Sequence, residues 1–111
     1  MVNKQLALRI ADKLDSKKGE DILILDVSQN TSYADYFIIV TGNSDKQIGA
    51  LSDEVSELLY QEGVKLLNLE GKNTGWILLD YGDIIVHIFS KEQRAHYGLE
   101  KLWSDSTIIE R

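Results

Sequence analysis

Residues 75–89 read Gly-Trp-Ile-Leu-Leu-Asp-Tyr-Gly-Asp-Ile-Ile-Val-His-Ile-Phe. Two apolar runs enclose a short polar group that contains glycine, which predicts two antiparallel strands joined by a tight turn. We place the turn at Tyr81-Gly82, so that Trp76 lies opposite His87. Tyrosine is not favoured at positive φ, so a register shifted by one residue, with the two faces exchanged, stays open.

Side chains alternate between the two faces of a sheet, so this hairpin has two different surfaces. The first is wholly apolar and is the expected core; it holds Ile77, Leu79, Ile84 and Val86. The second holds Trp76, Leu78, Ile85 and His87. Tryptophan is enriched at binding hot spots because it combines a large area with a polar group. The second face is therefore either a protein-contact surface or core beneath a covering helix.

Three segments predict helices. Apolar residues at helical spacing fill residues 5–17 and the stretch from Ser44 to Gly63. Ser44 and Gln47 have the spacing of a capping box, as do Ser90 and Gln93 before the last helix. That last helix is expected to place Ala95, Leu99, Leu102 and Trp103 on one side.

Three further segments predict strands beside the hairpin: 22–27, 35–41 and, more weakly, 64–70. The apolar run at 22–27 is continuous, which suits a strand buried on both faces. The resulting order is α-β-β-α-β-β-β-α. We therefore expect an α/β fold in which residues 1–111 form a single domain with a mixed five-stranded sheet.

Composition narrows the class of protein. The chain has 111 residues, of which 43% are hydrophobic and 27% charged, as in ordinary globular domains. It has no cysteine, which excludes disulfides and thiolate metal sites and suits a cytoplasmic location. No apolar run approaches the roughly 20 residues that a membrane span needs, so no membrane partner is expected.

Charge is unevenly distributed. Residues 1–18 hold five basic and two acidic residues, while residues 19–111 hold seven basic and sixteen acidic ones, a net of −9. Such a body repels phosphate backbones and attracts basic proteins, so no direct binding to DNA is expected. The basic N-terminal helix either contacts RNA phosphates or is simply a solvated face.

The candidates for chemistry are few. Asp80 and Asp83 at the turn either hold a divalent cation or are solvated turn acids. His87 and His96 lack the spacing of a zinc site. We therefore predict no catalytic residue, no metal and no cofactor.

One loop invites comparison with nucleotidyltransferases. Residues 41–44, Thr-Gly-Asn-Ser, lie between a strand and a helix N-terminus, where an anion could bind or where the helix is merely capped. A nucleotidyltransferase would also need an Asp-x-Asp pair on the next strand to hold magnesium. The segment 64–69 has no such pair. The chain is therefore not expected to be an enzyme.

A series of short motifs runs in order from residue 25 to residue 103. They are 25–27 (LDV), 34–37 (ADYF), 41–45 (TGNSD), 53–55 (DEV), 70–71 (EG), 76–83 (WILLDYGD), 86–89 (VHIF), 94–97 (RAHY), 99–100 (LE) and 102–103 (LW). In these segments the chain resembles the ribosomal silencing factor family, also called the Iojap-like proteins. The resemblance implies a fold distantly like that of nucleotidyltransferases, without their activity.

The resemblance also implies a function. Proteins of this family bind the large ribosomal subunit through ribosomal protein uL14, block joining of the small subunit sterically, and repress translation when nutrients are limiting. By this resemblance the contact residues are Trp76, Leu78, Asp80, His87 and Tyr97. A homodimer formed through the same apolar face is expected for the free protein. The alternatives are an adaptor in large-subunit assembly and, less favoured, a nucleotidyltransferase-like enzyme.

Overall fold

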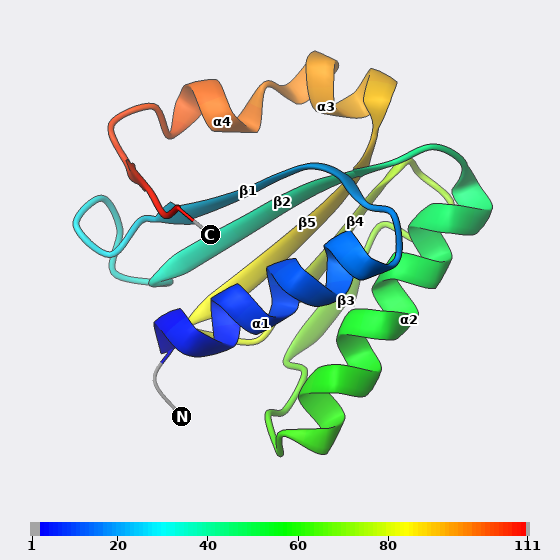
Figure 1. Ribbon diagram of the computed structural model, residues 1–111. Coiled ribbons are helices and arrows are strands. Elements are labelled where there is room, and N and C mark those ends of the chain that lie inside the picture. The colour runs from blue at the N-terminus through cyan, green and yellow to red at the C-terminus, as the bar shows by residue number, and fades with distance from the viewer. Residues whose placement is uncertain (1–2, 111) are drawn as a thin grey trace.

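The computed structural model describes residues 3–110, in which four helices and six strands follow one another along the chain (Figure 1). In chain order they are α1 (Asn3–Ser16), β1 (Glu20–Asp26), β2 (Tyr36–Gly42), α2 (Asp45–Gln61), β3 (Asn68–Glu70), β4 (Trp76–Asp80), β5 (Ile84–Ser90), α3 (Lys91–Tyr97), α4 (Leu99–Leu102) and β6 (Thr107–Ile108). The α/β class is confirmed. The predicted order of elements differs only at the C-terminal end, where the last helix is divided in two and a short strand follows it.

All six strands belong to one mixed sheet, in the order β3-β4-β5-β2-β1-β6. The central strands β2 and β5 are parallel, and the other neighbouring strands are antiparallel. The sheet thus has six strands, not the five predicted. The sixth, β6, is two residues long and places Ile108 opposite Leu25. So short a segment has no alternation that a sequence pattern could indicate.

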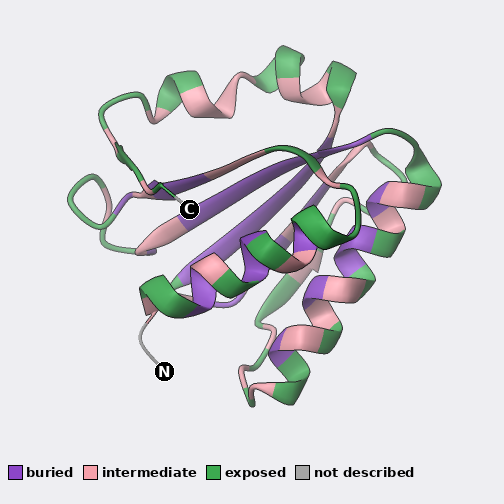
Figure 2. Ribbon diagram, in the orientation of Figure 1, coloured by how far each residue is buried: buried purple, intermediate pink, exposed green. Residues whose placement is uncertain are grey.

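Helices cover the two faces of the sheet (Figure 1). On one face lie α1 and α2, whose Ile10 and Leu51 are fully buried in the larger part of the core. On the opposite face lie α3 and α4, where Leu99 and Trp103 pack against a smaller cluster around Phe37. Figure 2 shows that the buried residues concentrate along the central strands, between these two layers.

The turn of the β4–β5 hairpin lies one residue later than predicted. Asp80 pairs with Ile85, and the Tyr81 N–H donates to the Ile84 carbonyl at 3.0 Å. The turn residues are therefore 82–83, not Tyr81-Gly82, and Trp76 lies opposite Phe89, not His87. The physical reason is that Gly82 adopts the positive φ of 89° that the turn requires, while the ring of Tyr81 is buried against the core.

The two faces of the hairpin are nevertheless those predicted. Ile77, Leu79, Ile84 and Val86 all lie in the core beneath α1 and α2. Trp76, Leu78 and Ile85 lie on the opposite face. When the turn moves by one residue, each residue of β4 pairs with a β5 residue two positions further along the chain. Side chains two positions apart lie on the same face of the sheet, so the faces do not change.

The single helix predicted after Ser90 is wrong, because it is interrupted at Gly98, which has a φ of 55°. This left-handed conformation ends α3, and α4 starts in a new direction. Ala95 and Leu102, expected on the buried side, are exposed. Leu99 and Trp103 do pack against the sheet, as predicted.

Two predicted strands are shorter or less buried than expected. Of residues 64–70, only Asn68–Glu70 is a strand. The strand predicted at 22–27 forms, but its N-terminal half is not buried on both faces. An irregularity interrupts its pairing between Glu20 and Leu23, where Asp21 has a positive φ of 50°. Such a bulge lets this end of β1 twist away from the core.

Candidate functional site

The face of the sheet opposite α1 and α2 is only partly covered. There α3 and α4 pack over β5, β2 and β1, whereas residues of β3 and β4 remain accessible (Figures 1 and 2). Leu78 and Asp80 of β4 are half-exposed, and their cross-strand neighbours Glu70 and Asn68 are exposed. The sheet therefore presents one open half beside the edge strand β3.

Four of the five predicted contact residues surround this opening: Trp76, Leu78, Asp80 and Tyr97. We call them the Trp76 face. The first three follow one another on alternate positions of β4, so they share one side of the strand. Tyr97 comes from the last residue of α3, and its ring centre lies 4.5 Å from that of Trp76. The fold thus places these four side chains on one accessible surface.

Trp76 is the centre of an aromatic cluster. Its ring is stacked on Phe89, with centres 4.9 Å apart and an interplanar angle of 24°. Its indole N–H donates to Nδ1 of His87 at 3.2 Å. The residue is neither fully buried nor fully exposed. One side of the ring therefore packs on the sheet while another part is accessible, so Trp76 is neither wholly core nor wholly surface.

His87 lies beneath this surface, at 4% exposure. Its ring meets Phe37 edge-on, with centres 5.1 Å apart. Burial lowers the pKa of His87 to about 4, so the ring is neutral at pH 7. The Nε2 atom has no hydrogen-bond partner among residues 3–110. His87, the fifth predicted contact residue, is therefore buried and does not lie on the accessible surface.

The two turn acids are engaged in separate interactions. Asp80 accepts a hydrogen bond from the Gly82 N–H at 2.8 Å, which stabilises the turn. The Asp83 carboxylate accepts from the Asn3 amide at 3.2 Å, and that amide also donates to Asp35. Within residues 3–110, no group of three or more histidine, cysteine, aspartate or glutamate residues could hold a metal ion.

Comparison with known proteins identifies the family. Residues 2–111 match the protein-family model described as "Ribosomal silencing factor during starvation". The chain belongs to the ribosomal silencing factor family. The Bacillus subtilis ribosomal silencing factor is 40% identical to it over 98% of this chain and 94% of that protein. The Zea mays chloroplastic Iojap protein is 36% identical over 94% of this chain, but only 46% of that protein.

Solved structures agree with this assignment. A crystal structure of a Chromobacterium violaceum protein superimposes with a TM-score of 0.90 at 34% identity, covering 94% of this chain and 88% of that one. A Bacillus halodurans structure gives a TM-score of 0.81 at 36% identity, covering 98% of this chain and 97% of that one. The fold of these two proteins therefore extends over nearly the whole chain. None of the helices in residues 3–110 has the length and apolar character of a membrane span.

The sequence patterns assigned no role to Arg94. Its Nη1 atom donates to the Asp21 carbonyl at 2.6 Å and to Thr41 Oγ1 at 2.9 Å. Its Nε atom lies 3.4 Å from a carboxylate oxygen of Glu100. These contacts attach α3 to β1 and β2 and so position Tyr97, at the end of α3, beside Trp76. No spacing rule predicts them, because the acceptors come from three separate parts of the chain.

The loop at 41–44 is occupied by capping interactions. Ser44 Oγ accepts from the Gln47 N–H at 3.1 Å, and the Gln47 side chain accepts from the Asn43 N–H. The predicted N-cap is thus confirmed. The Gln47 amide also donates to the Lys18 carbonyl at 2.9 Å, which joins this helix end to the turn after α1. His96, the second histidine, is exposed on α3 next to Tyr97.

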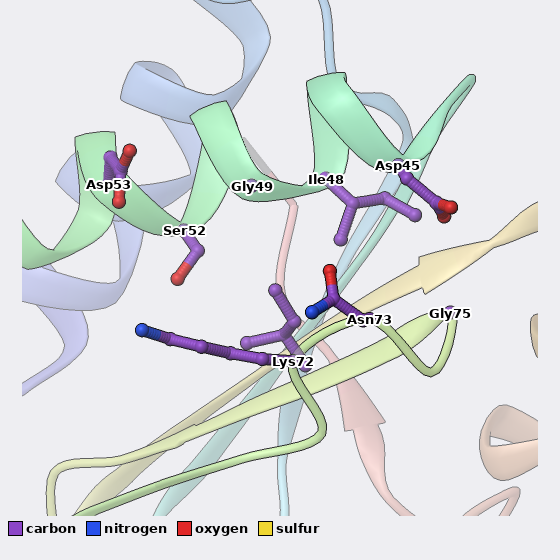
Figure 3. Close-up of a pocket in the computed structure, with 9 residues that line it drawn as sticks. Asp45, Ile48, Gly49, Ser52, Asp53, Lys72, Asn73 and Gly75 are labelled. Carbon is purple, nitrogen blue, oxygen red and sulfur yellow. The ribbon is translucent and has the colours of Figure 1, made fainter.

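A pocket of about 220 Å³ lies on the other side of the sheet, between α2 and the loop before β4. Charged residues of both signs line the pocket: Asp45 and Asp53 are acidic and Lys72 is basic. The apolar residues Ile48 and Ile77 also line it. Figure 3 shows the Lys72 side chain extended alongside α2, with its nitrogen on the side of Ser52. Since Ile77 points away from Trp76 on the same strand, this pocket is separate from the Trp76 face.

Proposed function

We propose that this protein is a ribosomal silencing factor that binds the large ribosomal subunit through ribosomal protein uL14. Binding there prevents the small subunit from joining and lowers translation when nutrients are limiting. The observation that carries the proposal is the match to the family over residues 2–111. The relatives named as ribosomal silencing factors cover nearly the whole chain, which supports the same role here.

The Trp76 face is the surface that we assign to this contact. It combines an aromatic and aliphatic centre with a carboxylate on Asp80, and Glu70 adds a second acid at the rim. Large aromatic side chains surrounded by polar groups are the usual composition of a binding hot spot. Acids at the rim favour a basic partner, as ribosomal proteins are, and would accelerate its approach.

The proposed mechanism needs no catalysis. The molecule measures 32 × 32 × 25 Å, and a body of this size on the intersubunit surface excludes the small subunit by volume. A second copy of the chain could occupy the same face before the ribosome does, which would make the free protein a dimer. We propose that it acts in the cytoplasm, where ribosomes assemble.

The proposal is tested by gradient sedimentation with purified subunits. The protein should travel with the large subunit and not with the small one, and it should reduce the fraction of joined ribosomes. Equal binding to both subunits, or undiminished joining at saturating protein, would contradict the proposal.

Two tyrosines provide a matched pair of variants for the contact surface. Tyr97 is 47% exposed on the Trp76 face, and Tyr60 is 80% exposed on α2, which covers the opposite face. Tyr97→Ala should weaken large-subunit binding roughly tenfold or more, as truncation of a hot-spot aromatic does. Tyr60→Ala should change it less than about twofold. Equal effects of the two changes would remove the Trp76 face from the proposal.

A further inference from the structure

Trp76 is held from below by a buried polar side chain. Its indole N–H donates to His87 Nδ1 at 3.2 Å across the β4–β5 pair. We propose that His87 is a positioning residue, which fixes the orientation of the Trp76 indole so that its accessible part faces the binding partner. The value of that orientation for binding rests on the proposed function; the orientation itself does not.

The arrangement limits how the indole can turn. One face of the Trp76 ring lies against Phe89, and Tyr97 approaches it from α3. These apolar contacts fix the plane of the indole ring. They do not fix the direction in which its N–H points, because stacking persists when the ring slides or turns over in the same plane. The hydrogen bond adds a direction, because an indole has a single N–H donor. The orientation of the Trp76 ring in this structure satisfies both the stacking on Phe89 and the bond to His87.

The surroundings of His87 show no other polar use for the ring. Its Nε2 atom has no hydrogen-bond partner among residues 3–110, and the side chain is 4% exposed. The rings packed around it, besides Trp76, are those of Phe37 and Phe89. A buried polar group costs stability unless it is hydrogen-bonded, so an aliphatic residue would fit this apolar site better. Within the described part of the chain, the bond from Trp76 is the hydrogen bond that the His87 side chain makes, and it explains a histidine here.

The bond also requires the neutral ring. Nδ1 can accept from the indole only when it carries no proton, which places the single proton of the neutral imidazole on Nε2. Burial among uncharged rings lowers the pKa of His87 to about 4, so the ring is neutral at pH 7, and the bond from the indole selects the tautomer with its proton on Nε2. The site thus keeps His87 in the state in which it can hold Trp76.

Two substitutions separate orientation from packing. His87→Leu removes the acceptor, while His87→Asn keeps an acceptor oxygen near the position of Nδ1. Trp76→Phe removes the donor and identifies the Trp76 indole signal in a ¹⁵N-labelled NMR spectrum. The second tryptophan, Trp103, packs in the same cluster without a bond to His87 and serves as the internal reference.

In the full-length protein, His87→Leu should shift the Trp76 indole signal and speed its exchange with solvent, and leave the Trp103 signal in place. Large-subunit affinity should fall roughly 2- to 10-fold, the range expected for one hydrogen bond, and His87→Asn should restore part of it. An unchanged Trp76 signal in His87→Leu, or equal behaviour of the Leu and Asn variants, overturns the positioning role. A displaced indole with undiminished binding supports the positioning role and overturns the contact role of the Trp76 face.

Discussion

His87 is a buried histidine whose protonation opposes folding. Burial lowers its pKa from the ordinary value of 6.5 to about 4. Between these pH values the unfolded chain binds a proton at His87 that the folded chain does not, so stability falls as the pH decreases. The part of the unfolding free energy that depends on neutral His87 is fully present above pH 6.5 and is lost as the pH falls towards 4. The full loss is about 3 kcal/mol.

We expect the free energy of unfolding to change with pH more steeply when His87 is present. Between about pH 7 and about pH 4.5, the wild-type protein should lose roughly 2 kcal/mol more unfolding free energy than His87→Asn loses. Urea denaturation at a series of pH values measures both. Both proteins carry the same carboxylates, so the difference between their pH profiles isolates His87. Parallel pH profiles would show that the histidine is not held neutral by the fold.

At the scale of elements, the junction between α3 and α4 decides how much of the sheet stays open. Gly98 has a φ of 55°, which an L-residue with a Cβ adopts only with strain. The bend at Gly98 directs α4 along β2 and β1, so that Leu99 and Trp103 cover Phe37. Because α4 does not extend over β3 and β4, Leu78 and Asp80 remain accessible.

Substitution of Gly98 tests this junction. Gly98→Ala should lower the unfolding free energy by roughly 1–2 kcal/mol, because alanine is strained at positive φ. Gly98→Asn should cost less, since asparagine tolerates this conformation. Urea midpoints of the three proteins give the order. A more stable alanine variant would mean that α3 and α4 can merge into one helix without losing the contacts of Leu99.

At the scale of the whole molecule, the net charge and the size of the protein support the proposed function. The formal net charge is −6, and the basic residues of α1 are partly paired with acids of α2 and its C-cap, as in Arg9 with Glu62 at 2.7 Å. That pairing leaves the negative charge in excess over the remaining surface. Such a body is drawn towards a basic protein surface and repelled by exposed RNA.

The rate of association with the large subunit should therefore depend on salt. Raising the ionic strength from about 0.05 M to about 0.5 M should lower the association rate constant roughly tenfold, with little change in the dissociation rate constant. Stopped-flow fluorescence of the labelled protein measures both constants. An association rate that is insensitive to salt would show that the acidic surface has no part in the encounter.

Local patterns were sufficient for several features of this protein. The caps at Ser44 and Ser90 and the assignment of β4 and β5 side chains to faces follow from residue type and spacing alone. The faces survived the misplaced turn because alternation has a period of two. The motifs around Trp76 also pointed to the family that the whole-chain comparison shows.

Other features depend on contacts between segments distant in the chain. The parallel pairing of β2 with β5, the edge strand β6 and the attachment of α3 through Arg94 all join such segments. Whether these contacts form depends on how well the fold as a whole buries its apolar side chains. The spacing of residues within one segment does not contain that information. For the same reason only the tertiary structure showed that Trp76 is half-covered and that His87 lies beneath it. Alternation assigns a side chain to a face of the sheet, but the helices packed on that face decide whether it is exposed.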